Sequence, residues 1–190
     1  MIGRSIIIFV LLSGAAASIG CHKHSTRATT QQLPKDETTA RVYENHDAGV
    51  HLEFPSSWQT HRSADYVWAI SPVSTGEAGA PEISLDVPSV PPHLPGMITL
   101  SAVKRGYLDD LRKQMKDLTV FADTDYTLPQ SKARWVEASG HDAGRARKVG
   151  ALLFIHAERV YILRADSSSD QYDKTKAVLD QIIASLRWIN

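Results

Sequence analysis

GVHLEFPSSW, residues 49–58, alternates apolar and polar side chains and then stops at a proline. Val50, Leu52 and Phe54 fall on one face of a segment with period 2, which is the pattern of a β-strand that buries one side. The proline cannot donate a backbone hydrogen bond to a sheet, so we expect the strand to end there. This stretch predicts the first strand of the folded domain, with Phe54 and Trp58 in its core.

Further segments downstream have the composition or the alternation of β-strands. They cover residues 66–70, 82–87, 119–127, 132–139, 145–155 and 160–165. From Val149 to Ile155 both alternating sets of side chains are largely apolar. A strand of that kind is expected where both faces of a sheet are covered, so the pattern predicts a helix on each side.

Two segments have apolar residues at helical spacing and would supply that cover. In residues 99–118 the apolar positions recur every three or four residues, with Thr99 or Ser101 as the candidate N-cap. The second helix is expected to start at Ser168 or Ser169, close to the end of the chain. The predicted fold class is α+β, with a sheet of about six to seven strands between helices.

Length and charge limit the function classes. The chain has 190 residues, which is enough for one domain with a hydrophobic core and short for two. Its 21 basic and 21 acidic residues balance, and no run of Lys and Arg is long enough to neutralise a phosphate backbone. Nucleic acid is therefore not expected as a partner. The single cysteine, Cys21, excludes an intramolecular disulfide.

The N-terminal residues have the order of a secretory signal peptide. One positive charge, Arg4, precedes an apolar run from Ile6 to Leu12 and then a series of small residues. That run is shorter than the roughly 20 residues that a membrane-spanning helix needs. Residues 1–20 are therefore predicted to be a signal peptide that is removed.

The sole cysteine follows Ser18-Ile19-Gly20, which resembles the lipobox of bacterial lipoproteins. The resemblance implies that Cys21 becomes the first residue of the mature protein and is acylated, which would anchor it to a membrane. Residues 21–40 are polar and rich in Thr, as expected of a flexible tether, and residues 41–190 are the predicted domain. The alternative is ordinary cleavage after Ala15-Ala16-Ala17, which would release a soluble protein.

The residues that could carry chemistry do not form a recognisable reaction centre. Neither Gly-x-Ser-x-Gly nor Ser-x-x-Lys occurs in a strand-to-helix context, and the sequence has no Gly-rich phosphate loop. His51 and Glu53 share the outward face of their strand and are a conceivable ion site, as are His22 and His24 in the tether. Solvated surface imidazoles are the simpler interpretation. We therefore predict a protein that is not an enzyme and that has no cofactor and no metal site.

Four basic residues are the candidate partner-binding residues. Lys132 and Arg134 share one face of a predicted strand, and Arg145 and Arg147 share one face of the next. If the two strands pair as a hairpin, we expect the four charges to gather near residues 139–144. Such a patch would attract an acidic partner or anionic lipid, although Lys and Arg also protect a sheet edge from pairing with another sheet.

Three short motifs occur in an order that is found in one known family. They are Gly-Val-x-Leu-x-Phe-Pro-x-x-Trp in 49–58, Arg159-Val160-Tyr161-Ile162-Leu163 in a late hairpin, and Ser185-Leu186-Arg187-Trp188 after the last helix. With the order of the elements, they make residues 42–189 resemble the PsbP-like family. The resemblance implies an antiparallel sheet between helices, and a function in binding other proteins without a shared active site.

The family resemblance and the N-terminus together predict a lipid-anchored protein of the bacterial cell envelope that faces the periplasm or the exterior. Its expected role is that of a non-enzymatic interaction or assembly module. The expected partners are a membrane, reached through Cys21, and another protein. The alternative is an envelope lipoprotein that binds a small ligand or a metal.

Acylation of Cys21 predicts that labelled palmitate enters the wild-type protein and not Cys21→Ser, because the chain has no other thiol. The variant should also leave the membrane fraction, since it has lost the acyl chains. Both effects are measured in a bacterial host, by labelling and by fractionation. Equal partitioning of the two proteins would contradict the anchor.

Overall fold

The chain is described over residues 39–61, 66–72, 80–89, 98–129 and 131–189 of a computed structural model. The predicted signal peptide, Cys21 and the tether as far as residue 38 lie outside these residues. The strands are β1 (Ala40–Asn45), β2 (Val50–Pro55), β3 (Trp58–His61), β4 (Trp68–Pro72), β5 (Glu82–Asp86), β6 (Lys116–Leu128), β7 (Ser131–Asp142), β8 (Arg145–His156), β9 (Arg159–Ser168) and β10 (Arg187–Trp188). The helices are α1 (Leu100–Gln114) and α2 (Tyr172–Ser185).

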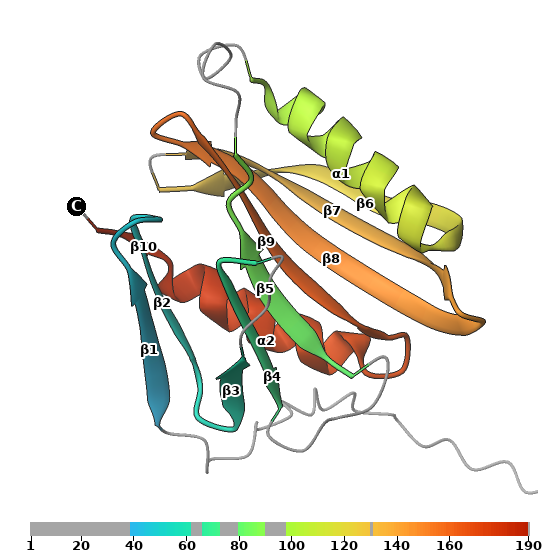
Figure 1. Ribbon diagram of the computed structural model, residues 1–190, viewed down its shortest axis with the longest axis horizontal. Coiled ribbons are helices and arrows are strands. Elements are labelled where there is room, and N and C mark those ends of the chain that lie inside the picture. Colours follow the sequence, from blue (N-terminus) through green and yellow to red (C-terminus); the bar gives the residue numbers. More distant parts are fainter. Residues whose placement is uncertain (1–38, 62–65, 73–79, 90–97, 130, 190) are drawn as a thin grey trace, which may run out of the picture. The chain divides into compact units, whose positions relative to one another are not determined.

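Most of the strands belong to one large antiparallel sheet. Its seven strands follow the order β3-β4-β5-β9-β8-β7-β6 (Figure 1). β1, β2 and β10 form a separate three-stranded sheet, which is also antiparallel. The predicted fold class, an α+β fold built on an antiparallel sheet of six to seven strands, is confirmed.

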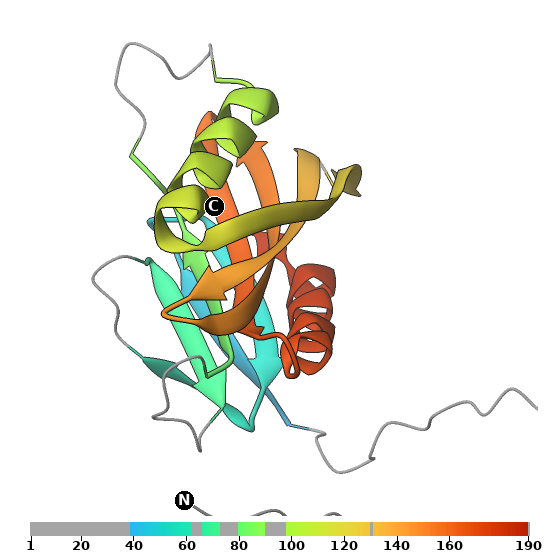
Figure 2. The same ribbon diagram turned by 90° about the vertical axis from the view of Figure 1, so that its right-hand side faces the viewer.

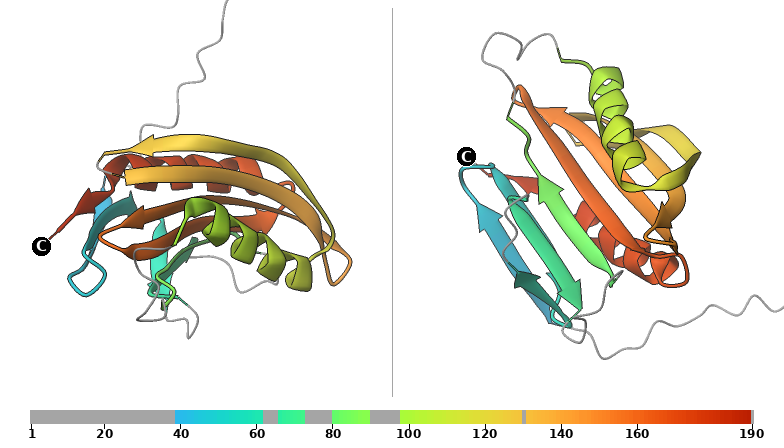
Figure 3. Two further views of the ribbon diagram at one scale, coloured as in Figure 1. Left: turned by 90° about the horizontal axis from the view of Figure 1, so that it is seen from above. Right: turned by 45° about the vertical axis from the view of Figure 1, so that its right-hand side comes forward.

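The large sheet lies between the two helices (Figure 2). α1 packs on one face, where it contacts β6, β7 and β8, and α2 packs on the other face, against β5, β8 and β9. α2 also contacts β2 of the small sheet. The view from above in Figure 3 shows the same layers, with α1 and α2 on opposite sides of the long strands. The cover on both faces that the sequence predicts is therefore present.

Alternate residues of β8 face two different hydrophobic cores. Under α1, the core contains Val149, Ala151 and Leu153 of β8 and, from the helix, Tyr107 and Leu111. Under α2, the core is larger and also takes in the small sheet. It contains Leu152 and Phe154 of β8 together with Leu52, Phe54, Leu163, Leu179 and Ile182. β8 is thus buried on both of its faces.

Two tight turns connect β7, β8 and β9. Ala143 and Gly144 have φ values of 47° and 81°, and Ala157 and Glu158 have φ values of 46° and 63°. Two consecutive positive φ angles are the geometry of a type I′ turn, whose twist matches the twist of the strands that it joins. Three of these four residues are not glycine and adopt the left-handed region at a cost. The long ladders on both sides of each turn hold them there.

Gly150 makes room for the start of α2. A Cβ atom at this position would lie 2.2 Å from Tyr172 Oη and 3.1 Å from the Trp135 ring. Tyr172 is the first residue of α2 and is buried, and its hydroxyl donates a hydrogen bond to Glu137 Oε1 at 2.9 Å. A side chain at position 150 would displace this tyrosine, so the close approach of helix and sheet requires glycine.

The stretch 49–58 is not the first strand of the domain, as the sequence predicted. Val50–Pro55 is β2, β1 precedes it and pairs with it along its whole length, and β3 begins at Trp58. The prediction was wrong because β1 is held by its backbone ladder and has mostly exposed side chains. Such a strand has little of the apolar alternation by which strands are recognised.

The helix starts were predicted with different success. Thr99 is the N-cap of α1, as expected, and its Oγ1 accepts a hydrogen bond from Ala102 N at 3.2 Å. α2 begins after Gln171 and not at Ser168 or Ser169, since Ser168 is still paired within β9. In the described part of the chain, neither helix is long and apolar enough to cross a membrane.

Phe54 and Trp58 are buried, with 4% and 6% of their surface exposed, which confirms their predicted place in the core. Trp58→Ala should lower the free energy of unfolding by about 3–5 kcal/mol, because it leaves a large cavity. Val42→Ala is the control, since Val42 is 56% exposed and should change stability by less than about 0.5 kcal/mol. Denaturant unfolding measures both, and equal midpoints would show that Trp58 does not support the core.

Candidate functional site

The four basic residues that the sequence singled out lie in two places. β7 and β8 form the expected hairpin, with Arg145 and Arg147 beside the turn and Lys132 and Arg134 at the far end of β7. Arg134 stands opposite Leu153, roughly 26 Å along β8 from Arg145. A hairpin brings together residues that are equally far from its turn. Lys132 and Arg134 lie much farther from the turn than Arg145 and Arg147, so the expected gathering of four charges was wrong.

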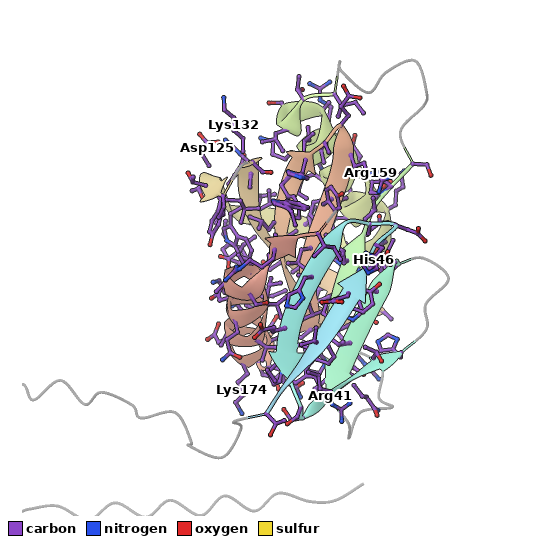
Figure 4. The ribbon with its side chains drawn as sticks, turned by 90° about the vertical axis from the view of Figure 1, so that its left-hand side faces the viewer. Arg41, His46, Asp125, Lys132, Arg159 and Lys174 are labelled. Carbon is purple, nitrogen blue, oxygen red and sulfur yellow. The ribbon has the colours of Figure 1, made fainter. Side chains whose placement is uncertain are left out.

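Arg134 is bound to two carboxylates of the neighbouring strand β6. Its Nε donates to Asp123 Oδ1 at 2.6 Å and its Nη1 donates to Asp125 Oδ1 at 2.7 Å. Asp123 also accepts a hydrogen bond from Lys104 Nζ of α1 at 2.8 Å. The hydrogen bonds from Arg134 and Lys104 lower the pKa of Asp123 to about 2. These contacts link α1 to the β6 side of the sheet, and Figure 4 shows Asp125 beside Lys132 at this edge.

Arg147 is part of a second ion-pair network. Its Nη1 donates to Asp142 Oδ2 at 2.5 Å, and its Nε and Nη2 donate to the two carboxylate oxygens of Asp166. Burial lowers the pKa of Arg147, but the two aspartates raise it by more, so the guanidinium remains charged. Both carboxylate partners of Arg147 belong to the domain itself, so this residue has a structural role whether or not an outside partner binds there.

Strand β6 is an edge of the large sheet and has exposed apolar side chains. The described residues include five large apolar side chains that are exposed, and three of them, Val120, Phe121 and Tyr126, are on β6. Phe121 is 50% exposed and Tyr126 is 40% exposed. Next to them on β7, the half-buried Trp135 ring has Lys176 Nζ 5.0 Å from its centre. The edge is therefore rich in aromatic surface.

The backbone of β6 has an irregular part and a regular part. Its register with β7 shifts between Val120 and Ala122, so Phe121 has no residue opposite it on β7. Lys148 Nζ lies 5.9 Å from the centre of the Phe121 ring. From Ala122 to Leu128 the pairing is continuous. We call the side chains of Phe121 and Tyr126 and the outer backbone of Ala122–Leu128 the β6 edge surface.

The chemistry of the β6 edge surface suits recognition. An edge strand has backbone N–H and C=O groups on its outer side that can pair with a further strand. Adding a strand in this way gives affinity through main-chain hydrogen bonds and specificity through side-chain contacts. Phe121 and Tyr126 would supply such contacts. Sequence reasoning predicted this strand but not its edge position. The polar residues Asp123, Thr124, Asp125 and Thr127 were a signal that neither face there is deeply buried.

The conceivable ion site at His51 is a pair of contacts to glutamates. His51 Nδ1 lies 3.0 Å from Glu44 Oε1, and His51 Nε2 lies 3.6 Å from Glu53 Oε1. Over the ranges that the structure describes, no group of three or more His, Cys, Asp and Glu side chains is arranged to hold a metal ion. His22 and His24 lie outside those ranges.

Comparison with known proteins adds evidence on the fold. A scan against protein-family models gave no match, and a search of curated proteins gave none. Among solved structures, the chain is similar to cyanobacterial PsbP (CyanoP) from Synechocystis, with a TM-score of 0.61 and 10% sequence identity over 84% of this chain and 98% of CyanoP. The PsbP-like fold that the sequence predicts is thus confirmed.

Two further structures are similar over most of the chain. LpqN, a protein involved in cell envelope biogenesis of Mycobacterium tuberculosis, gives a TM-score of 0.58 at 15% identity, with 80% of this chain and 91% of LpqN covered. A Pseudomonas aeruginosa protein of unknown function, described as a putative regulator, gives a TM-score of 0.50 at 15% identity, with 75% of this chain and 92% of that protein covered. At these identities the likeness establishes the fold alone.

The ion pairs of Asp123 predict its titration. Arg134→Gln should raise the pKa of Asp123 from about 2 toward the usual value of about 3.9, because it removes the stronger of two hydrogen bonds to the carboxylate. Folding lowers this pKa, so the stability that the pair adds is present above about pH 4 and is lost as the pH falls toward 2. An NMR titration of the carboxyl carbon measures the shift. Lys132→Gln is the control and should leave it unchanged; a titration of Asp123 unaffected by Arg134→Gln would contradict the pairing.

Proposed function

We propose that this chain is a lipid-anchored envelope protein whose domain binds another protein through the β6 edge surface and has no catalytic activity of its own. The observation that carries the proposal is the combination at one sheet edge of exposed Phe121 and Tyr126 with a regular outer backbone from Ala122 to Leu128. An edge strand of this kind is open to strand addition unless something covers it.

The location in the envelope rests on the N-terminus and on one relative in fold. The order of the first 20 residues and the lipobox-like Ser18-Ile19-Gly20-Cys21 favour export and acylation. LpqN, which shares the fold, is involved in cell envelope biogenesis in its own organism. Two or more acyl chains on Cys21 would hold the domain at a membrane almost permanently, with the tether setting its reach toward a partner.

The expected partner is a protein that contributes an extended segment. Such a segment would pair with the outer backbone of Ala122–Leu128 and place apolar side chains against Phe121 and Tyr126. The two carboxylates of this edge, Asp123 and Asp125, are already engaged by Arg134. Charge would therefore contribute less to the contact than main-chain pairing and apolar burial, and the complex should tolerate moderate salt.

A photo-crosslinking residue tests the proposal in the membrane of the native host. Placed at Phe121 or Tyr126, it should give one discrete crosslinked species, because both positions would face the partner. Placed at Val42 on β1, which is at least as exposed as either position, it should give none. The double variant Phe121→Ser, Tyr126→Ser should also reduce recovery of the crosslinked partner by detergent extraction and capture, whereas Val42→Ser should not.

Thermal unfolding of each variant separates loss of binding from loss of fold. All the substituted side chains are exposed, so their unfolding midpoints should stay close to that of the wild type. Crosslinks of equal strength from Val42 and from the β6 positions, or full recovery of the partner by the folded double variant, would place the binding surface elsewhere.

A further inference from the structure

A cavity of about 860 Å³ lies on the α1 face of the large sheet, between α1 and the strands β5 and β9. This volume falls within the range of about 300–1,000 Å³ that is usual for small-molecule sites. One part of its wall is apolar and consists of Val103 and Leu111 of α1 and Val160 and Ile162 of β9. The other part is polar and includes Arg164 of β9 and Tyr107 of α1. The cavity therefore has the two-sided character of a site for an amphipathic molecule.

Arg164 is a buried cation that lacks a full set of partners. Only 11% of its side chain is exposed, and among the described residues its Nε has no hydrogen-bond acceptor. Nη2 donates to Tyr66 Oη. The nearest carboxylate, Asp166, is 3.9 Å away, because Arg147 already binds both of its oxygens. Burial lowers the pKa of Arg164, but the acidic groups around it raise it by more, so the guanidinium is charged.

Tyr107, which also lines the cavity, has a second buried donor without a partner among the described residues. The residue is 8% exposed, and within the described residues its hydroxyl has no hydrogen-bond partner. Burial raises the pKa of this hydroxyl, so it keeps its proton and can donate. A buried donor without an acceptor destabilises the fold, and most buried donors in proteins find a partner in the protein, in water or in a ligand. Arg164 Nε and Tyr107 Oη are two such donors at one polar end.

We infer that this cavity binds a small monocarboxylate with an apolar body. The carboxylate accepts hydrogen bonds from Arg164 Nε and Tyr107 Oη, and the body lies along β9 against Ile162, in the direction of Val160. From Arg164 to Ile162 the strand spans roughly 7 Å, which suits an extended chain of about six carbons. Guanidinium is the usual partner of a carboxylate, and a charge-assisted hydrogen bond is stronger than a neutral one. The polar end of the cavity thus matches the carboxylate of the ligand, and its apolar wall matches the hydrocarbon body.

The charges around the cavity select a single negative group. Asp86 and Asp110 also line it, and Asp110 is paired with Lys113 and largely exposed. A phosphate ester would bring a second negative charge close to these carboxylates without a second free cation in the described wall of the cavity. Like charges in a partly buried site repel each other, so a monoanion is favoured over a dianion.

Hexanoate tests the inference on the full chain held in detergent micelles, with two-dimensional NMR as the residue-specific readout. It should shift amide signals of α1, β5 and β9, and hexanamide, which has the same body without the charge, should bind at least about tenfold more weakly. Tyr107→Phe should weaken hexanoate binding about tenfold while the unfolding midpoint stays equal or rises, since its hydroxyl has no partner to lose. Arg164→Lys should also weaken binding, because lysine cannot reproduce the guanidinium geometry.

Tyr172→Phe is the matched control on the opposite face of the sheet. It removes the hydrogen bond to Glu137, so it should lower the unfolding midpoint and leave hexanoate binding unchanged. The β6 double variant should bind hexanoate like the wild type, which separates this site from the partner-binding surface. The inference is overturned if hexanoate shifts none of the cavity signals or if hexanamide binds equally well. It is also overturned if Tyr107→Phe and Arg164→Lys both fold and keep the wild-type affinity.

Discussion

The burial of β8 on both faces is the constraint on which the rest of the structure depends. From Val149 to Phe154 this strand has no polar side chain, and Leu152, Leu153 and Phe154 are fully buried. Antiparallel sheets commonly leave one face to water, but here each alternating set would expose apolar surface unless a layer covered it. α1 and α2 are those layers. β8 also needs partners on both sides within the sheet, and the tight turns to β7 and β9 supply them through consecutive positive φ angles.

The two faces of the large sheet are covered to different extents, and the polar cavity lies where the cover by α1 ends. A helix is about 10 Å wide and strands are about 4.8 Å apart, so one helix covers only two or three strands of a seven-stranded sheet. On the α2 face, β2 of the small sheet extends the cover, and the core includes Trp68, Ile70, Ile83 and Leu85. On the α1 face, the residues of one row across the sheet change from Val136 and Ala151 under the helix to Arg164 and Ser84 beyond it. The cavity lies at this transition, where an apolar wall and a buried guanidinium meet.

The features that follow from local pattern were predictable from the sequence, and those that depend on which elements become neighbours were not. The two apolar sets of β8, the N-cap at Thr99 and the burial of Phe54 and Trp58 are local, and all three are found. β1 and β10 are held by pairing with β2, so their own residues show little pattern. Arg134 reaches Asp123 across a ladder that contains a bulge, and no spacing rule gives that register. In the sequence Arg164 is a single charged residue between Leu163 and Ala165, as a solvent-facing strand residue would be. Its burial depends on the position of α1, which is fixed by packing far along the chain.

Helix α1 connects the two surfaces that distinguish this domain. Lys104 binds Asp123 of β6, and Tyr107 borders the cavity. These two residues are three positions apart, so their side chains leave neighbouring sides of the same turn. A helix moves as a rigid element, and its position is set jointly by the ion pairs with β6 and by the packing of Tyr107 and Leu111 on the sheet. The contact of Lys104 with Asp123 and the packing of Leu111 hold α1 from two sides. One helix therefore contributes both to the wall of the cavity, through Tyr107, and to the ion pairs of β6, through Lys104.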